Sequence, residues 1–361
     1  MPSDGTQIFA RFLQRASPLP IAIVASKSAD GLAASAMAQE ALSREGFRVE
    51  RSFFPARGEN PYGQKFLVAL ASSGARAYLW LDLGAREKGI MGDSPALFID
   101  DHDETSSPEA RTLFGGGEAF PLLQADPDGR RLSTGGILFE NLRREFSVED
   151  LRWLAEVSAC AGEEDGTIRL DEEPLVSRVS DLREIVTLLN ASHRSKESLV
   201  NEIVVLLRKA AGPGRFLKAK GNVAARLHQA REEVKAEVSL SSHVAPIFMW
   251  RVALVPFSSP CLVEGVLAAR WERMLSDYVV IASNFFLGET VTFSAKTLTR
   301  IHVVRFLRGA GRGLGDEFYV LGHPHSASGS ATLAAFKVLL KRLRFRGIDE
   351  VVERGRRPLG R

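Results

Sequence analysis

The stretch Ile21–Gly31 constrains the fold more than any other part of the chain. A short apolar run, Ile21–Ala25, stops at small and polar residues, and an alanine-rich segment with a helical pattern begins at Gly31. This order predicts a buried strand, a tight turn and the start of a helix. In an open α/β sheet, ligands collect at the carboxyl ends of the strands. The turn Ser26–Gly31 is therefore the first place to look for chemistry.

Later segments extend the same pattern. The runs Ala77–Asp82 and Ala96–Asp101 are apolar without interruption until they end in acidic residues, which is typical of buried parallel strands. Helical patterns over Gly31–Arg44 and Gln64–Ser73 separate these strands from each other and from a strand at Arg48–Phe54. Strands that alternate with helices form βαβ units with right-handed crossovers. The sequence therefore predicts a doubly wound parallel sheet.

The second half of the chain differs in pattern. Residues 174–240 carry apolar side chains only at helical spacing, with an interruption at Gly212–Gly214, and strand patterns return beyond Val244. Strands are expected at Ile247–Val255, Tyr278–Phe286, Thr290–Ser294, Ile301–Leu307 and Phe318–Leu321. Helices are expected at Ser133–Phe146, Val148–Cys160, Phe216–Val238, Leu262–Leu275 and Thr332–Arg344.

Length and composition agree with this division. A chain of 361 residues fits two domains, and its 45% hydrophobic and 25% charged residues are typical of globular proteins. We see no apolar run long enough for a membrane span and no secretion signal. Cys160 and Cys261 lie far apart in the sequence, which argues against a disulfide framework and for a cytoplasmic protein.

Charge is distributed unevenly along the chain. The net charge is only +3, but residues 201–361 contain 25 Lys and Arg against 13 Asp and Glu. Such asymmetry is a hint that the basic part contacts nucleic acid or a membrane surface, although a charged solvated surface is an equally good explanation.

Five short motifs at strand ends and in loops stand out: Ala25–Ala34, Leu81–Asp82, Phe98–Asp103, Ser133–Leu138 and Gly322–Gly329. In this order they resemble the motifs of DHH-family phosphoesterases, and the resemblance covers nearly the whole chain. It implies an α/β DHH domain with a parallel doubly wound sheet over residues 1–170 and a helical connector over 171–240. As in RecJ-type exonucleases, a smaller α/β DHH-associated domain follows over 241–347, and residues 348–361 form a basic tail.

Enzymes of this family bind two divalent metals, typically Mn²⁺, which stabilise the attacking hydroxide and the departing oxygen. Their ligands come from His-x-Asp-x-Asp after the first strand, an Asp at a later strand end, the Asp-His-His triplet and an Asp on a following helix. In this chain Ser26 stands at the His position and Ser28 at the first Asp, while Asp30 retains the second.

The later motifs are also altered in part. Asp82 fits the second motif, but the triplet reads Asp100-Asp101-His102, so that its middle His is an Asp. The helix expected to supply the last ligand reads Glu156–Gly162, with Glu163 and Glu164 beyond it and no Asp at the expected place.

Serine hydroxyls are poor ligands for a hard dication, so these exchanges predict the loss of the two-metal site. We therefore expect no catalytic residue and no cofactor. The alternative is a single weak site for Mn²⁺ or Mg²⁺ formed by Asp30, Asp82, Asp100 and His102, and these acids can equally be interpreted as simple loop caps.

The second domain is expected to retain nucleic-acid contacts. Gly322–Gly329 is similar to the family's Gly-Gly-His-x-x-Ala-Ala-Gly loop, which contacts nucleic acid, although one residue is inserted and Leu321 replaces a glycine. A turn that needs small residues to start a helix is the alternative. The resemblance implies contacts from Gly322, His323, His325, Ser326 and Gly329.

Arginines next to the glycine-rich stretch Gly309–Gly315 add positive charge, and we expect phosphate contacts from Arg308 and Arg312. Lys27 is a further candidate, because it is placed where a dication would otherwise supply positive charge. No stacking platform is expected. Phe248, Trp250 and Phe285–Phe286 lie within strand runs and are predicted to be in the core.

A DHH chain without its metal ligands resembles archaeal RecJ-like proteins, and this resemblance implies partners. Some of those proteins act with the GINS complex and the MCM helicase at the replication fork, in the role of the inactivated DHH subunit of the CMG helicase. The expected function is thus a non-catalytic replisome component that binds single-stranded DNA and is associated with an archaeal nucleoid. The alternatives are a Mn²⁺-dependent single-strand exonuclease of RecJ type with a remodelled metal site and a small-nucleotide phosphodiesterase.

Overall fold

The computed structural model describes residues 4–84, 94–102, 119–122, 132–162, 168, 170 and 174–358, which form two compact units. Unit 1 comprises Met1–Pro55, Gln64–His193 and Ser198–His228. Unit 2 comprises Ala56–Gly63, Arg194–Glu197 and Gln229–Arg361. The motif residue Asp103 and the acids Glu163 and Glu164 lie outside the described residues.

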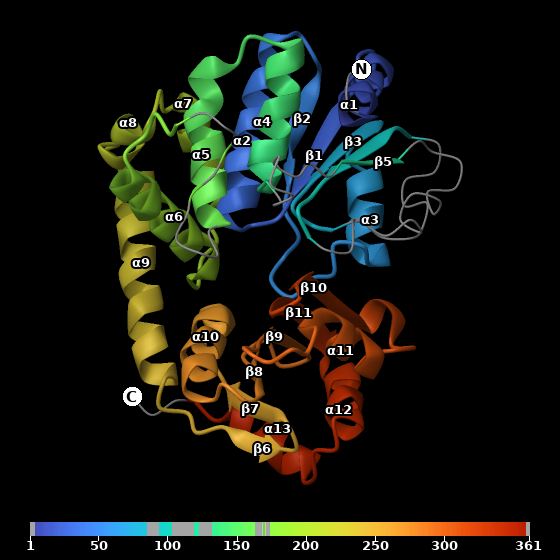
Figure 1. Cartoon of the computed structure of the whole chain (residues 1–361), viewed down its shortest axis with the longest axis vertical. Helices are drawn as coiled ribbons and strands as arrows, with labels where there is room; N and C mark the ends of the chain where they lie inside the picture. Colours follow the sequence, from blue (N-terminus) through green and yellow to red (C-terminus); the bar gives the residue numbers. More distant parts are fainter. Residues whose placement is uncertain are drawn as a thin grey trace. The chain divides into compact units, whose positions relative to one another are not determined.

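A five-stranded parallel sheet forms the centre of unit 1 (Figure 1). The strand order is β2-β1-β3-β4-β5, and every neighbouring pair is parallel, which confirms the predicted α/β sheet. Strand β5 was not predicted from the sequence. The strands are β1 Ile21–Ala25, β2 Val49–Phe53, β3 Ala77–Leu81, β4 Ala96–Ile99 and β5 Ala119–Leu122.

Helices cover both faces of this sheet. Successive side chains of a strand point to opposite faces, and in β1 and β3 all of them are buried. Ile23 and Leu79 belong to a core shared with several helices, whereas Trp80 stacks on Phe98 and meets Phe66 of helix α3 on the other face. Figure 1 shows α2, α4 and α5 on one side of the sheet and α3 on the other. The helices are α1 Asp4–Ala16, α2 Ala29–Arg44, α3 Gln64–Ala71, α4 Thr134–Glu145 and α5 Arg152–Ala161.

In the segment predicted as a helical connector, every described element of secondary structure is a helix. Its first helices pack onto the core of unit 1 through buried residues such as Ile185 and Ile203. The single basic helix expected over Phe216–Val238 is instead two helices, because the chain turns at Gly221 with φ +108°. The helices are α6 Val179–Arg194, α7 Val200–Lys209, α8 Pro213–Leu217 and α9 Asn222–Ser241.

Unit 2 is built on a six-stranded mixed sheet of order β10-β11-β9-β8-β7-β6. Only β7 and β8 are parallel, and the other neighbouring pairs are antiparallel. The strands are β6 Ile247–Met249, β7 Val252–Phe257, β8 Val279–Asn284, β9 Thr290–Lys296, β10 Phe318–His323 and β11 Ser326–Thr332. The helices are α10 Glu264–Met274, α11 Val303–Ala310, α12 Leu333–Arg342 and α13 Ile348–Arg356.

The structure corrects several expectations in unit 2. The run Ile247–Val255 is not one strand but the β6–β7 hairpin. The strand expected at Ile301–Leu307 is helix α11, whose buried Val303, Val304 and Leu307 follow helical spacing. An apolar run this short is compatible with either structure, and its packing decides between them.

The motif Gly322–Gly329 and the expected basic tail also take regular structure. Gly322–Gly329, expected to be a loop, forms the β10–β11 hairpin, which turns between His323 and Ser326. The expected basic tail contains α13, whose Val351 and Val352 are buried in the core of unit 2. This apolar pair packs a largely polar helix onto the core of unit 2.

Among the described residues, no helix is both long enough and apolar enough to cross a membrane.

Candidate functional site

The carboxyl ends of β1, β3 and β4 meet at one edge of the sheet in unit 1. Hydrogen bonds from Ser26 N to Leu81 O and from Asp82 N to Ile99 O, both 3.1 Å, extend the sheet one residue beyond each strand. This register places Ser26, Asp82 and Asp100 side by side. Because parallel strands end at the same edge of the sheet, three residues that are widely separated in the sequence lie together there.

Two serine hydroxyls form hydrogen bonds with the same carboxylate oxygen of Asp82. Ser26 Oγ and Ser28 Oγ both donate to Asp82 Oδ2, and the two hydroxyl oxygens lie 2.9 Å apart. Ser28 also caps helix α2, since its Oγ accepts from Gly31 N at 3.0 Å. Gly31 is needed here, because a Cβ would lie 2.5 Å from the Ser26 carbonyl oxygen. The turn between β1 and α2 therefore holds both hydroxyls on the carboxylate.

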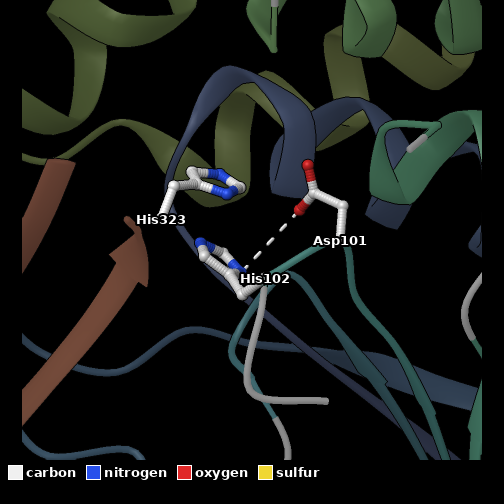
Figure 2. Close-up of side chains that lie close together, drawn as sticks. All are labelled: Asp101, His102 and His323. Atoms are coloured by element: carbon white, nitrogen blue, oxygen red, sulfur yellow. Dashed lines mark ion pairs between the residues drawn. The ribbon is translucent and has the colours of Figure 1, made fainter. Parts of the chain in front are cut away.

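Four side chains at this edge form what we call the strand-end cluster: Asp82, Asp100, Asp101 and His102. Each offers one ligand atom, and these atoms all lie within 4.8 Å of one another. His102 Nδ1 lies 2.5 Å from Asp100 Oδ1, 3.7 Å from Asp101 Oδ1 and 3.8 Å from Asp82 Oδ1. Figure 2 shows His102 and Asp101, with their ion pair as a dashed line.

The electrostatics of the cluster favour a charged imidazole. Burial opposes that charge, but the carboxylates of Asp100, Asp101 and Asp82 outweigh burial and raise the pKa of His102 well above its ordinary value. Burial raises the pKa of Asp82, and Asp101 adds to this rise, while His102 and the two serine hydroxyls oppose it. The acids are thus compensated from within the chain by one cation and two hydroxyls.

Asp30 lies in a separate hydrogen-bond network at the start of helix α4. Its carboxylate accepts from Thr134 N and Gly135 N, both at 3.0 Å, and from Ser158 Oγ. Ser158 Oγ also lies 2.9 Å from Ser133 Oγ. Burial raises the pKa of Asp30 well above its ordinary value, with Asp82 and Asp101 adding to the rise. Asp30 therefore ties α2 to α4 and α5, and it is not part of the strand-end cluster.

The sequence did not indicate the partners of Asp30. Ser133, at the start of the motif Ser133–Leu138, caps helix α4, with its Oγ accepting from Gly136 N at 3.2 Å. Ser158 lies in the motif Glu156–Gly162, where an Asp was sought. A further contact, Ala29 N to Asn190 Oδ1 at 3.3 Å, brings α6 to the same turn. The sequence around each of these residues gives no sign that it contacts a residue more than one hundred positions away.

The donor set of the strand-end cluster fits one divalent cation. Three carboxylates and an imidazole within 4.8 Å are ligands suited to Mn²⁺. Ser26 and Ser28 both donate to Asp82 Oδ2, so this oxygen already has two hydroxyl partners.

The candidate nucleic-acid residues are divided between the units. Lys27 is half-buried between the two serines in unit 1. In unit 2 Gly322 and Gly329 are required by close backbone pairing, since a Cβ on either would lie 2.1 Å from a carbonyl oxygen. His323 and Ser326 are half-buried in the same hairpin, and His325 is exposed.

The two arginines differ in how far the fold engages them. Arg308 donates from Nη2 to Val320 O at 3.2 Å, so its guanidinium supports strand β10. The side chain of Arg312 is exposed, and its backbone carbonyl accepts from Arg342 Nη1 at 2.7 Å. Arg312 is therefore the more accessible of the two cations.

Comparison with solved structures shows which known fold the chain adopts. No protein-family model matches the sequence, and a search of curated proteins finds no match. The structure of RecJ with Mn²⁺ from Thermus thermophilus matches 98% of this chain at a TM-score of 0.63 and 16% identity. The chain has the RecJ-type DHH fold. It spans only 55% of that RecJ, whereas it spans 97% of another manganese-bound RecJ exonuclease, with a TM-score of 0.60 and 17% identity.

A third match widens the range of functions found on this fold. CDC45 from Entamoeba histolytica matches 94% of this chain and 98% of its own length, with a TM-score of 0.55 and 8% identity. The RecJ-type fold thus occurs both in exonucleases and in CDC45, and the fold alone does not decide between their functions.

Replacement of Asp30 tests its role in the fold. Asp30→Ala removes the acceptor of Thr134 N and one acceptor each of Gly135 N and Ser158 Oγ, so we expect unit 1 to lose about 2–3 kcal/mol of stability. Urea unfolding in EDTA measures this loss in the absence of divalent metal. Glu145→Ala, an exposed change at the other end of α4, is the control and should stay within about 0.5 kcal/mol. A loss that appears only when Mn²⁺ is added would contradict the structural role.

Proposed function

We propose that this protein is a non-catalytic component of a DNA replication complex that binds single-stranded DNA and associates with the GINS complex and the MCM helicase. The observation that carries the proposal is the bonding of Ser26 and Ser28 to Asp82. Hydroxyls there replace the ligands on which two-metal hydrolysis depends. Neither a catalytic residue nor a cofactor is required by this function.

The fold and the charge distribution support the proposal. A chain of this size matches CDC45 over nearly the whole of both proteins, and the motifs resemble those of archaeal RecJ-like proteins. The surplus of Lys and Arg over residues 201–361 suits contact with phosphate groups. The same proposal assigns the protein to the cytoplasm of an archaeon, at the nucleoid.

A second candidate function rests on the strand-end cluster. Asp82, Asp100, Asp101 and His102 suit one Mn²⁺ or Mg²⁺ ion, and manganese-bound RecJ exonucleases share the fold. A metal bound there would polarise a phosphate oxygen. The alternative protein is a single-strand exonuclease of RecJ type with a remodelled site.

A nuclease assay separates the two candidates. We expect the purified chain with Mn²⁺ to degrade labelled single-stranded DNA no faster than its His102→Gln variant, because the second metal has no ligands. Asp82→Asn, which keeps the shape of the side chain, should give the same background rate. Mn²⁺-dependent activity in the wild type that both variants lose would contradict the proposal and establish the exonuclease. Asp30→Ala is unsuitable here, because its loss of activity would follow from loss of structure.

The partners are tested by capture from the native host. A tagged chain, purified from extract treated with nuclease to remove bridging DNA, should retain GINS and MCM subunits, as identified by mass spectrometry. A parallel purification from an untagged strain shows the background. Absence of both complexes from the tagged sample would contradict the assignment of partners, while leaving DNA binding to be judged by itself.

A further inference from the structure

The hairpin between β6 and β7 exposes a tryptophan. Met249 pairs with Val252, so Trp250 and Arg251 alone form the turn. The side chain of Trp250 is 71% exposed, which corrects the expectation that it lies in the core. Of the aromatic residues predicted to be buried with it, Phe248 and Phe286 are also exposed, and only Phe285 is buried.

The backbone of Trp250 adopts a conformation that its side chain disfavours. Its φ is +51°, in the left-handed region that two-residue hairpins normally fill with glycine, asparagine or aspartate. A bulky residue with positive φ is rare, and strain of this kind is concentrated at functional sites. Neither packing nor turn geometry accounts for a tryptophan at this position, whereas a ligand that needs an exposed ring would.

Other aromatic and cationic side chains lie beside this tryptophan. The guanidinium carbon of Arg251 lies 6.0 Å from the centre of the Trp250 ring, within cation–π range. Phe248, which is 48% exposed, contacts Tyr278 edge to face, with their ring centres 5.2 Å apart. The hairpin thus presents aromatic surface and positive charge together.

Strand register places further residues at the same end of the sheet. Val252 pairs with Val279 at the start of β7 and β8, and Val280 pairs with Lys296 at the end of β9. Lys296 pairs in turn with Ser326 at the β10–β11 turn. The β6–β7 turn and the β10–β11 turn therefore lie at the same end of the sheet, whose strands can be followed in Figure 1.

Hydrogen bonds connect the members of this end of the sheet. Thr297 N donates to His325 O, and Thr297 Oγ1 donates to Tyr278 O, each at 3.1 Å. Val279 N donates to Arg251 O at 2.8 Å. We call the resulting set the aromatic row: Trp250, Arg251, Tyr278, Lys296 and His325.

The composition of the row suits single-stranded nucleic acid. From β11 to β7 it crosses three strand spacings, or roughly 15 Å. Proteins that hold single strands combine cations along the backbone path with aromatic rings on which bases stack. Two acids lie near the row: Asp277 precedes Tyr278 in the sequence, and Glu272 has its pKa raised by burial and lowered by Lys296, His325 and Arg273.

We infer that the aromatic row binds single-stranded DNA, with a base stacked on Trp250 and phosphates near Arg251 and Lys296. The inference rests on the proposed function and adds a contact that the motifs did not predict. It links the hairpin of His325, already a nucleic-acid candidate, to a stacking residue at the opposite side of the same sheet end.

Replacement of Trp250 by glycine gives the sharpest test. Trp250→Gly removes the ring and suits the positive φ, so the melting temperature should stay the same or rise. Binding of a fluorescein-labelled oligothymidylate by the full chain, measured by anisotropy, should weaken about tenfold. Binding of an abasic strand of the same length should not change, because it has phosphates but no bases. Trp250→Phe, which keeps a stacking ring, should retain most of the affinity.

Phe286→Ala is the matched control. Phe286 is also an exposed aromatic residue of unit 2. It lies just beyond the last residue of β8, whereas Trp250 lies at the end of the sheet where β8 begins. Its replacement should leave both affinities unchanged. Equal binding by wild type and Trp250→Gly, or an equal loss for the oligothymidylate and the abasic strand, would overturn the stacking role. Failure of the wild type to bind either strand would overturn the proposed function as well.

Discussion

Unit 1 must accommodate several buried acids at the carboxyl ends of its parallel strands, and the hydrogen bonds from Ser26 and Ser28 to Asp82 meet part of this constraint. Four aspartates gather where the parallel strands end, and burial alone would make their charges costly. The chain compensates them with its own groups: two hydroxyls and His102 at the strand-end cluster, and backbone amides of α4 at Asp30. The acids at this edge of the sheet therefore have hydrogen-bond or ion-pair partners within the chain itself.

Much of the fold of unit 1 was predictable, because its strands are continuous apolar runs separated by helical patterns. Strand β5, a short run at Ala119–Leu122, was missed, and the sequence around α11 was misread. In α11 the adjacent pair Val303–Val304 favours a strand, whereas the N-cap contact of His302 with Arg305 N is visible only in the structure. Local propensity is weak wherever packing on a sheet decides the outcome.

The site was predictable in part for a related reason. Strand ends in a parallel sheet meet at one edge, so the proximity of Asp82 to Asp100 followed from the sequence. The separation of Asp30 from them did not follow, because its partners Thr134 and Ser158 come from helices more than one hundred residues away. Trp250 was assigned to the core because a strand run gives no sign of the two-residue turn that exposes it.

The proposed function rests on the hydroxyl groups that Ser26 and Ser28 place on Asp82, and the stoichiometry of Mn²⁺ binding tests it most directly. Titration of the metal-free chain, followed by electron paramagnetic resonance, counts bound ions and detects spin coupling between neighbouring ones. The account predicts at most one bound Mn²⁺ per chain, with no coupled pair. Two bound Mn²⁺ ions with a coupled spectrum would contradict it, because such a pair requires ligands that Ser26 and Ser28 do not provide.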